Sequence, residues 1–465
     1  MIKDALALLR VGLYSVRRRL SSPFFKKIYR RERYIIRLHL TARLKNGIFF
    51  QSINERAGNI EMKYSMDEVI QYTREEDVEF IRLTFCDVFG RQKNISILPD
   101  ELPRAFEHGI AFDGSAIRGF GDEARSDLFL RPEPETLMPL PFRPEYGSAV
   151  QMFSLITEPD GTPFECDTRN LLKKAAAEAK RKGVEFTFGA EQEFYLFRLG
   201  ADGRPTNIPV DSAGYMDAAP EDGCENIRRD ICLTLGQMGI RSECSHHEEG
   251  PGQNEIDFRY SDALTAADQV MMFQRTVKTI AARNGLYADF SPKPIENAPG
   301  SGFHINMSLK TFDEECFKGM IAGILRNVKA MTAFLNPSAE SYKRLGRNKA
   351  PGFISWSAGN RSQLIRIPAA ANEFRRAELR SPDPSANPYI AFALMICAAL
   401  DGIENRLELP EPSPANLNLF RADNETLSRF ERLPETFGSA CSIAASSGFI
   451  RAHIPERIVN IYCGG

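Results

Sequence analysis

The chain has 465 residues, of which 43% are hydrophobic and 26% charged, and its formal net charge is −2. These values are ordinary for a globular protein, and the length is too great for one small core, so at least two domains are expected. Nine cysteines without a Cys-x-x-Cys pair argue against a zinc ribbon and a disulfide framework and favour a reducing, cytoplasmic location. No run of about 18 uncharged apolar residues occurs, so no membrane-spanning helix is expected.

The first 61 residues differ in composition from the rest. Residues 1–61 contain 14 Lys or Arg and 4 Asp or Glu, so they carry +10 and residues 62–465 carry −12. A basic, acid-poor segment is typical of a membrane-surface arm, a nucleic-acid-binding arm or an Arg-rich transit peptide. Met62 precedes a helix start in which Ser65 is the N-cap and Glu68 stands three residues later. We interpret residues 1–61 as a basic extension, with translation starting at Met62 as the hypothesis, and expect no nucleic-acid or membrane partner for residues 62–465.

Residues 62–167 have the signals of a small, mostly β domain. Residues 80–88 alternate between apolar and polar side chains, as a strand does, and residues 92–98 can pair back after a turn at Gly90. A Gly- and Ser-rich loop that carries one acid, Asp113, follows. A proline-rich connector then leads to a further strand.

The remaining residues, 168–465, contain helices and strands whose polar faces carry charge. Residues 184–197 predict an apolar, buried strand, on which Glu191 and Glu193 leave the same face because they are two residues apart. Two carboxylates on a buried strand require a balancing cation. The stretch 243–255 adds four acids and two adjacent histidines around a Gly-Pro-Gly turn. In isolation such a stretch would be interpreted as a solvated acidic loop, but several distant stretches complement it.

Two later strands each present polar side chains on one face. These residues are His304, Asn306 and Ser308 in the first strand and Arg376, Glu378 and Arg380 in the second. A single histidine is more often a core residue than a ligand, and alternating charges on an exposed strand form a salt-bridge ladder. Polar companions on the same face instead favour a site that handles anions together with a cation.

Six side chains form a candidate centre for two hard cations. They are Glu191, Glu193, Glu248, Glu255, His304 and Glu378. Mg²⁺ or Mn²⁺ prefers oxygen ligands and leaves positions open for phosphate oxygens and water. Five arginines suit carboxylate and phosphate groups, namely Arg344, Arg361, Arg366, Arg376 and Arg380. Two cations with several arginines indicate phosphoryl transfer, whereas the sequence contains neither a P-loop nor a dinucleotide-binding motif.

Six short motifs follow one another along the chain. They are residues 113–120 (Asp-Gly-Ser-Ala-Ile-Arg-Gly-Phe), 189–194 (Gly-Ala-Glu-Gln-Glu-Phe), 246–255 (His-His-Glu-Glu-Gly-Pro-Gly-Gln-Asn-Glu), 300–304 (Gly-Ser-Gly-Phe-His), 360–362 (Asn-Arg-Ser) and 378–384 (Glu-Leu-Arg-Ser-Pro-Asp-Pro). Jointly they resemble the bacterial type I glutamine synthetase family, from about Met66 to the C-terminus. The resemblance implies an α+β fold: a small N-terminal β-grasp domain, 62–167, and a large catalytic domain, 168–465, on a curved antiparallel sheet with helices. It also implies a dodecamer with active sites between neighbouring subunits.

The resemblance further implies a reaction and a set of site residues. The reaction is the ATP-dependent ligation of ammonia to glutamate through γ-glutamyl phosphate, with two or three Mg²⁺ or Mn²⁺ ions in each active site. By position, Glu193, Glu248 and Glu255 match one metal site, and Glu191, His304 and Glu378 match the other. Gly300, Arg344 and Arg380 match glutamate-binding positions, and Glu243, Asn306, Ser308, Arg366 and Arg376 match positions near ATP. The implied catalytic residues are Arg361, toward the transferred phosphoryl group, and Asp113 of a neighbouring subunit, toward ammonium.

Some positions depart from the family pattern. Lys349 stands where the family has a glutamate that closes the site and helps to hold ammonium. A lysine there would repel ammonium and, at an ordinary pKa of about 10.4, could not accept its proton. Pro299 replaces an asparagine that contacts glutamate, and Asp122 replaces an arginine of members inhibited by glutamine. The region after Arg380 lacks the tyrosine-bearing loop that some members have adenylylated.

Three functions are compatible with these residues. The leading prediction is an ATP-dependent glutamate–ammonia ligase. The second is a γ-glutamyl ligase that uses an amine or polyamine in place of ammonia, which the residues at Lys349 and Pro299 favour. The third is a weakly active regulatory homologue, against which the six intact metal positions argue, because five clustered carboxylates have little use without the chemistry.

Overall fold

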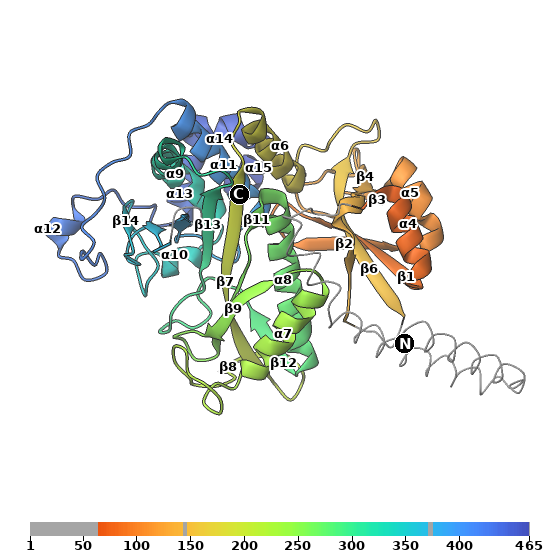
Figure 1. The fold of residues 1–465 in the computed structure, drawn as a ribbon, viewed down its shortest axis with the longest axis horizontal. Helices are drawn as coiled ribbons and strands as arrows, with labels where there is room; N and C mark the ends of the chain where they lie inside the picture. The colour runs from red at the N-terminus through yellow and green to blue at the C-terminus, as the bar shows by residue number, and fades with distance from the viewer. Residues whose placement is uncertain (1–63, 143–146, 371–374, 465) are drawn as a thin grey trace, which may run out of the picture. The chain divides into compact units, whose positions relative to one another are not determined.

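The computed structural model describes residues 64–142, 147–370 and 375–464, and the basic extension predicted for residues 1–61 lies outside these ranges (Figure 1). Residues Tyr64–Gly465 form one compact unit. Within the described residues this unit contains two sheets, one of six strands and one of ten. Each sheet is covered by helices, which gives a mixed α+β fold.

The six-stranded sheet belongs to the N-terminal part of the unit. Its strands are β1 (Val78–Cys86), β2 (Gln92–Ile97), β3 (Ile110–Asp113), β4 (Asp127–Pro132), β5 (Met138–Pro139) and β6 (Ser148–Thr157). They lie in the order β2-β1-β6-β4-β3, with β5 paired to β6. β1 pairs antiparallel with β2, as the sequence predicts, and parallel with β6.

Two helices and two single turns of 3₁₀ helix complete this part. They are α4 (Met66–Glu75), η1 (Pro99–Glu101), α5 (Leu102–His108) and η2 (Pro134–Thr136). The capping box predicted at the start of α4 is present: the Ser65 hydroxyl accepts from Glu68 N, and the Glu68 carboxylate accepts from Ser65 N at 2.7 Å. α4 and α5 lie beside each other against this sheet (Figure 1).

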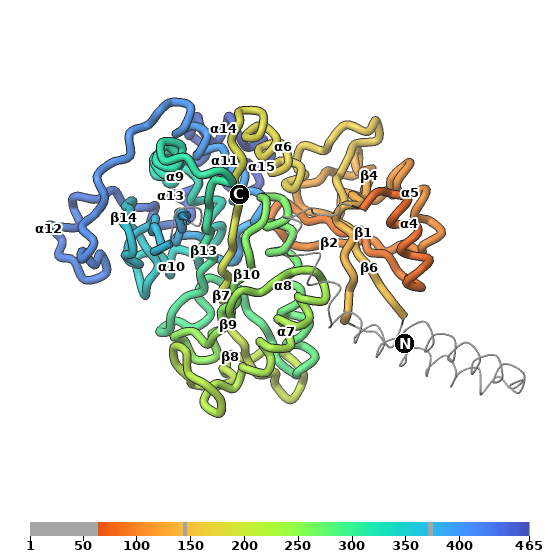
Figure 2. The backbone as a smooth tube through the Cα atoms, viewed as in Figure 1, coloured from red at the N-terminus to blue at the C-terminus, as the bar shows by residue number. Residues whose placement is uncertain are grey.

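The ten-stranded sheet carries the charged residues singled out from the sequence. Its strands are β7 (Phe186–Leu199), β8 (Pro205–Pro209), β9 (Ser242–His247), β10 (Gln253–Phe258), β11 (Ser261–Asp262), β12 (Leu286–Asp289), β13 (Phe303–Leu309), β14 (Trp356–Ala358), β15 (Ile365–Ile367) and β16 (Ala377–Leu379). The main order is β14-β15-β16-β13-β7-β10-β9, and β8, β11 and β12 also pair with β7. The long strand β7 is therefore the common partner that holds this sheet together (Figure 2).

The helices of this part enclose the sheet and build the core. They are α6 (Thr168–Arg181), α7 (Glu225–Gln237), α8 (Ala263–Arg283), α9 (Glu314–Leu335), α10 (Ser341–Arg344), α11 (Pro388–Glu404), α12 (Asn424–Leu427), α13 (Phe437–Ser446), α14 (Gly448–His453) and α15 (Glu456–Cys463). α11 is apolar on nearly all sides, as expected of a helix buried in a core. Among the described helices, none has the length and hydropathy needed to cross a membrane.

Helices α9 and α11 approach so closely that only glycine fits at their contact. A Cβ atom at Gly323 of α9 would lie 1.9 Å from the carbonyl oxygen of Ala398, and one at Gly402 of α11 would lie 1.9 Å from the carbonyl oxygen of Gly319. Both distances are far below van der Waals contact. The glycines therefore set the separation of the two central helices.

Buried polar contacts join the N-terminal part to the rest of the unit. Asn387 donates to the carbonyl oxygen of Val88 at 3.0 Å, and the Tyr462 hydroxyl donates to the same oxygen at 2.8 Å. Arg169 forms buried ion pairs with Glu133 and, at 2.8 Å, with Asp268. A buried charge pair that loses one partner is strongly destabilising, so these contacts hold the two sheets as one unit.

Candidate active site

The register of the ten-stranded sheet gathers the charged side chains on one face. Glu191 of β7 lies opposite Asp257 of β10 and also opposite His304 of β13. Glu193 of β7 lies opposite Glu255 of β10. Directly opposed residues on neighbouring strands project to the same face. Pairing between strands that are far apart in sequence therefore brings four carboxylates and an imidazole together.

Glu191, His304 and Glu378 form the first group. Their ligand atoms all lie within 4.8 Å of one another, and His304 Nδ1 lies 3.4 Å from Glu191 Oε2 and 3.7 Å from Glu378 Oε1. Burial lowers the pKa of His304 to about 4, so the imidazole is neutral and able to act as a ligand. Arg366 and Arg380 each donate to one oxygen of Glu378. The structure thus brings together the three residues that the sequence assigns to one metal site.

Glu248, Glu255 and His246 form the second group, again with ligand atoms within 4.8 Å of one another. Burial raises the pKa of Glu248, and burial together with neighbouring carboxylates raises that of Glu255 well above its ordinary value. Glu193, which the sequence assigns to this site, lies beside the group, and its Oε2 accepts from Gly302 N at 2.8 Å. His246 is the third member of the group, although it is not among the candidate ligands that the sequence predicts.

Asp257 is a further acid beside these groups, and it is not among the six candidate ligands that the sequence predicts. Its ligand atom lies within 4.8 Å of those of Glu191 and Glu255. Burial and then the charge of Glu191 raise the pKa of Asp257 to about 7. Its Oδ1 is buried without a hydrogen-bond partner, while its Oδ2 accepts from Cys244 Sγ at 2.8 Å. The sequence does contain a signal for this position, because Asp257 follows Glu255 by two residues and so projects from the same strand face.

The chemistry of this donor set fits hard divalent cations. Carboxylates crowded at short range repel one another, and an unpartnered buried oxygen costs free energy. A divalent cation would relieve both penalties, and carboxylate oxygens with neutral imidazole nitrogens are ligands that Mg²⁺ and Mn²⁺ accept.

Buried arginines lie beside the first group. Arg344 NH1 donates to the carbonyl oxygen of Ser381 at 2.7 Å. A Cβ atom at Gly300 would lie 2.5 Å from the carbonyl oxygen of Pro292 and 2.9 Å from Arg344 Cγ, so only glycine fits between that backbone oxygen and this arginine. The Nε atoms of Arg366 and Arg380 are buried without a partner. Unpartnered guanidinium donors fit a carboxylate or phosphate ligand.

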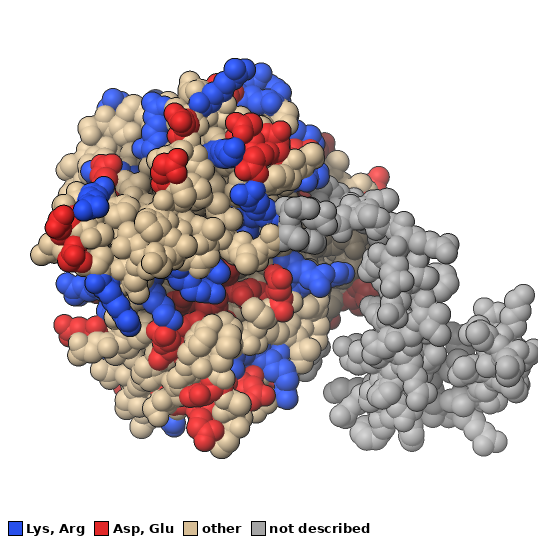
Figure 3. Space-filling model, turned by 60° about the vertical axis from the view of Figure 1, so that its left-hand side comes forward, with Lys and Arg blue, Asp and Glu red and all other residues tan. Residues whose placement is uncertain are grey.

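A chain of polar contacts extends from Glu191 along β13. Asn306 Nδ2 donates to Glu191 Oε1 at 2.7 Å, and Arg376 Nε donates to Asn306 Oδ1 at 3.1 Å. Ser308 Oγ donates to a backbone carbonyl at 2.7 Å, and Glu243 is exposed on β9. On one face of the molecule, acidic and basic side chains stand next to one another along a hollow (Figure 3). Such a surface suits a ligand that carries both phosphate groups and cations.

Three residues singled out from the sequence are not members of either group. Asp113 ends β3 and is exposed, and its Oδ1 accepts from the N–H and the hydroxyl of Ser115. Arg361 is exposed between β14 and β15. Lys349 is exposed, and its Nζ lies 2.6 Å from Glu249 Oε1. Within the described ranges, no contact joins Asp113 to the two groups.

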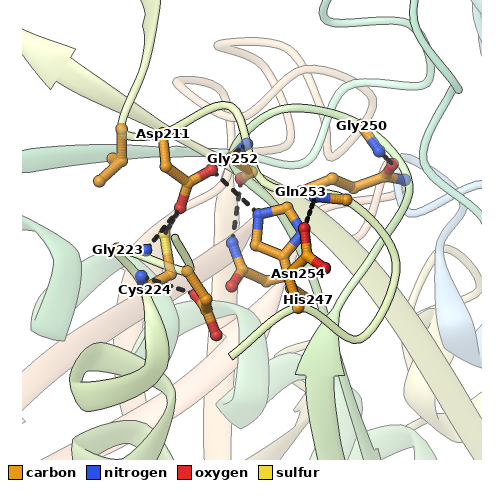
Figure 4. A network of polar contacts seen from close by, with 12 residues as sticks. Asp211, Gly223, Cys224, His247, Gly250, Gly252, Gln253 and Asn254 are labelled. Atoms are coloured by element: carbon orange, nitrogen blue, oxygen red, sulfur yellow. Dashed lines mark hydrogen bonds and ion pairs between the residues drawn. The ribbon is translucent and has the colours of Figure 1, made fainter. Parts of the chain in front are cut away.

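A buried network holds the backbone of the second group in place (Figure 4). His247 Nε2 lies 3.0 Å from Asp211 Oδ1, and His247 Nδ1 lies 2.6 Å from the carbonyl oxygen of Glu248. Asp211 also accepts from Gly252 N at 2.9 Å and Gly223 N at 3.0 Å. Burial opposes ionisation of Asp211, but the hydrogen bonds from His247 and Gly252 lower its pKa to about 2. The network fixes the turn from which the Glu248 carboxylate projects.

These features define a class of enzyme site. One sheet face holds acids and neutral imidazoles suited to divalent cations, and arginines with free donors flank it. An enzyme that moves a phosphoryl group between anionic substrates needs this combination, because charge neutralisation and positioning supply most of the catalysis.

The comparisons with known proteins name the family. Residues 165–464 match the family model described as glutamine synthetase, catalytic domain, and residues 77–159 match that described as glutamine synthetase, beta-Grasp domain. The chain belongs to the glutamine synthetase family. The predicted fold, a β-grasp domain followed by a large catalytic domain with helices, is thereby confirmed.

Individual relatives agree with this assignment. The glutamine synthetase of Clostridium saccharobutylicum is 42% identical over 417 residues, which cover 87% of this chain and 94% of the relative. That of Methanosarcina mazei is 42% identical over 412 residues, which cover 85% and 92%. The solved structure titled as a GmaS/ADP complex has a TM-score of 0.76 at 27% identity and covers 85% of this chain and 94% of its own. The glutamine synthetase of Plasmodium falciparum has a TM-score of 0.74 at 22% identity, covers 86% and 94%, and shows the fold alone.

Proposed function

We propose that the chain is a type I glutamine synthetase whose two cation groups on the sheet serve the phosphoryl transfer. Its activity is that of an ATP-dependent glutamate–ammonia ligase, because curated glutamine synthetases are 39–42% identical to it over most of the chain. The motifs of the sequence support the type I subfamily, while the relatives include bacterial and archaeal enzymes. The relatives do not favour an amine-accepting ligase or a weakly active regulatory homologue.

The observation that carries the proposal is the register of β7. It supplies Glu191 to the group with His304 and Glu378, and it places Glu193 beside the group of Glu248 and Glu255. When bound there, Mg²⁺ or Mn²⁺, two or three ions in each site, neutralises the oxygens of ATP and of the transferred phosphoryl group. Ligands for one cation thus gather around Glu191, and ligands for the other gather around Glu193, two residues further along the same strand.

The remaining residues bind and orient the substrates. Arg344 and Arg380, with the backbone at Gly300, bind glutamate through its carboxylates. The γ-carboxylate is thereby placed to accept the phosphoryl group of ATP, which gives γ-glutamyl phosphate, and Arg361 neutralises the charge of that group. The residues that orient ATP are Glu243, Asn306, Ser308, Arg366 and Arg376.

The second half of the reaction needs a group from another subunit. Ammonia attacks the γ-glutamyl carbon, phosphate leaves, and a carboxylate takes the proton that ammonium loses. Asp113 suits the attraction of ammonium, because its hydrogen bonds with Ser115 lower its pKa and keep the carboxylate ionised. It is exposed on β3, so we assign it to the active site of a neighbouring subunit in a dodecamer.

The proposed organisation extends to the whole chain. Residues 1–61 form a basic extension, residues 62–167 the β-grasp domain and residues 168–465 the catalytic domain. The matched ranges, 77–159 and 165–464, support this division. All nine cysteines are free, which supports a cytoplasmic location.

The test is a stoichiometric assay of the purified protein with glutamate, ammonium, ATP and Mg²⁺. Glutamine, ADP and phosphate should appear in equal amounts. Glu378→Gln, which keeps the shape and removes the charge, should lower turnover at least about a hundredfold, because it removes a cation ligand. Formation of a γ-glutamyl amide from ethanolamine or a polyamine, without glutamine from ammonium, would contradict the proposal.

A further inference from the structure

Lys349 lies at the tip of a tight loop between α10 and β14. Gly346 N donates to the carbonyl oxygen of Ala350 at 2.9 Å, and Ala350 N donates to that of Arg347 at 2.9 Å. Asn348 and Lys349 both have left-handed backbone conformations, with φ of 43° and 69°. Residues other than glycine rarely adopt this conformation. The loop therefore holds Lys349 in one defined place.

The ammonium group of Lys349 occupies a cation-binding position. Its Nζ lies 2.6 Å from Glu249 Oε1 and 5.4 Å from the centroid of the Tyr215 ring. A carboxylate and the face of an aromatic ring are two groups that attract ammonium ions. The side chains of Lys349 and Glu249 are 51% and 41% exposed, so they can separate without disturbing the core.

This cation-binding position adjoins the second cation group of the active site. The Tyr215 ring meets the His246 ring edge-on, with centroids 5.4 Å apart and planes at 73°. Glu249 N donates to Glu248 Oε2 at 3.0 Å. An ammonium ion held by Glu249 and Tyr215 would therefore lie next to His246 and Glu248.

Building on the proposed function, we infer that Glu249 determines affinity for the ammonium substrate and that Lys349 is a plug that competes for it. In the unliganded enzyme the lysine ammonium takes the place of substrate ammonium on the Glu249 carboxylate. Substrate ammonium displaces it and gains the same carboxylate. Residue 349 is a lysine and cannot attract ammonium. In this inference Glu249, the residue after the proposed cation ligand Glu248, supplies the negative charge that does.

The experiment compares the KM for ammonium in Glu249→Gln, Lys349→Gln and the double variant. Loss of a charge-assisted contact should raise the KM of Glu249→Gln about tenfold. Loss of the competing cation should lower the KM of Lys349→Gln several-fold. In the double variant the lysine substitution should give no further decrease, because no carboxylate remains to be uncovered. The KM values for glutamate and ATP should stay within about twofold throughout.

Hydroxylamine separates a charge effect from a general disturbance of the site. It is mainly neutral near neutral pH, so Glu249→Gln should leave its KM unchanged. The matched control is Glu404→Gln, which breaks the Lys182–Glu404 ion pair of 2.6 Å at the ends of α6 and α11. This control should change neither KM.

Several results would overturn the inference. They are an unchanged ammonium KM in Glu249→Gln, an equal rise for hydroxylamine, and a higher ammonium KM in Lys349→Gln. A wild-type protein that makes no glutamine would instead contradict the proposed function. If the wild type makes glutamine and Glu249→Gln leaves the KM for ammonium unchanged, the result contradicts the roles inferred for Glu249 and Lys349 and leaves the proposed function standing.

Discussion

The carboxylates on the sheet face repel one another when no cation is present, and the same negative charge attracts a cation. Burial raises the pKa of Glu248, Glu255 and Asp257, and charges on neighbouring acids add to the effect for Glu255 and Asp257. Each of them resists ionisation when no cation is present. The face is therefore a source of instability in the metal-free protein and of affinity once a cation binds.

The first prediction concerns the pH dependence of metal-free stability. The pKa of Asp257 is about 7 in the folded protein against an ordinary value of 3.8, so between these values the folded state binds a proton that the unfolded state has lost. Stability supplied by Asp257 is therefore lost as pH rises from about 4 to about 7. Calorimetry in a chelator should show a Tm that falls over this interval. The fall should be smaller in Asp257→Asn, and an identical fall in both proteins would contradict the prediction.

The second prediction concerns metal affinity. Asp257→Asn should weaken Mn²⁺ binding about tenfold or more at neutral pH, because Asp257 adjoins Glu191 and Glu255 and adds negative charge to the site. Titration calorimetry with Mn²⁺ measures this directly. The control is Asp230→Asn, at an exposed position of α7, which should bind Mn²⁺ as the wild type does. Equal affinity in both variants would exclude Asp257 from the cation centre.

At the scale of helices and strands, the local patterns of the sequence predict the elements well. The strand predicted at 184–197 is β7, Phe186–Leu199, and the hairpin at 92–98 is β2, Gln92–Ile97. These elements follow from alternation and turn residues, which are properties of neighbours in sequence. The fold as a whole can be predicted only from the joint resemblance of six motifs to the glutamine synthetase family.

Contacts between elements that are far apart in the chain are harder to predict from the sequence. His246 and Asp257 enter the cation groups because β9, β10 and β7 pair in one particular register, which tertiary packing sets. Glu193, which the sequence places with Glu248 and Glu255, lies opposite Glu255 and accepts from Gly302 N, a contact with a loop more than one hundred residues away that local patterns do not show. Likewise, the sequence marks Lys349 as unusual but does not show that its partner is Glu249.

The third prediction concerns the contact between α9 and α11. Gly323→Ala should lower the free energy of unfolding by about 1–3 kcal/mol or more, because its Cβ would lie 1.9 Å from the carbonyl oxygen of Ala398. Gly236→Ala in α7 is the matched control, since nothing lies within 4 Å of its Cβ position. It should stabilise by up to about 1 kcal/mol, because alanine favours helices. Denaturant titration of both variants tests the difference, and equal effects would mean that the two helices can move apart.

For the whole molecule, Asp113 is exposed on β3, in a different sheet from the acids of the candidate site. In the described residues its hydrogen bonds are local ones with Ser115. A ring of subunits with head-to-tail contacts would bring such a surface against the site of the next subunit. The catalytic unit would then be a pair of subunits.

The fourth prediction is complementation between two inactive variants. Asp113→Asn and Glu378→Gln should each lack most activity as pure oligomers. After dissociation and joint reassembly, a site that combines an intact Glu378 with a neighbour's intact Asp113 is restored, at roughly a quarter of all sites for random mixing. Glutamine formation by the mixture, compared with separately reassembled variants, measures this. Absence of recovery in a correctly assembled mixture would place Asp113 and Glu378 in the same subunit's site.

The strand β7 sets the separation of two candidate cation ligands. Glu191 and Glu193 stand two residues apart on it, a distance of ~6.8 Å along an extended chain. In the proposed function, in which Glu191 and Glu193 belong to different cation groups, the strand backbone therefore sets the separation of the two cations and flexible side chains do not. Ligands around each position can be exchanged in evolution without altering that spacing. A single residue inserted between the two glutamates would turn one of them to the opposite face of the sheet. The phosphoryl donor, ATP, and the acceptor, glutamate, would then no longer be held in a fixed position relative to each other.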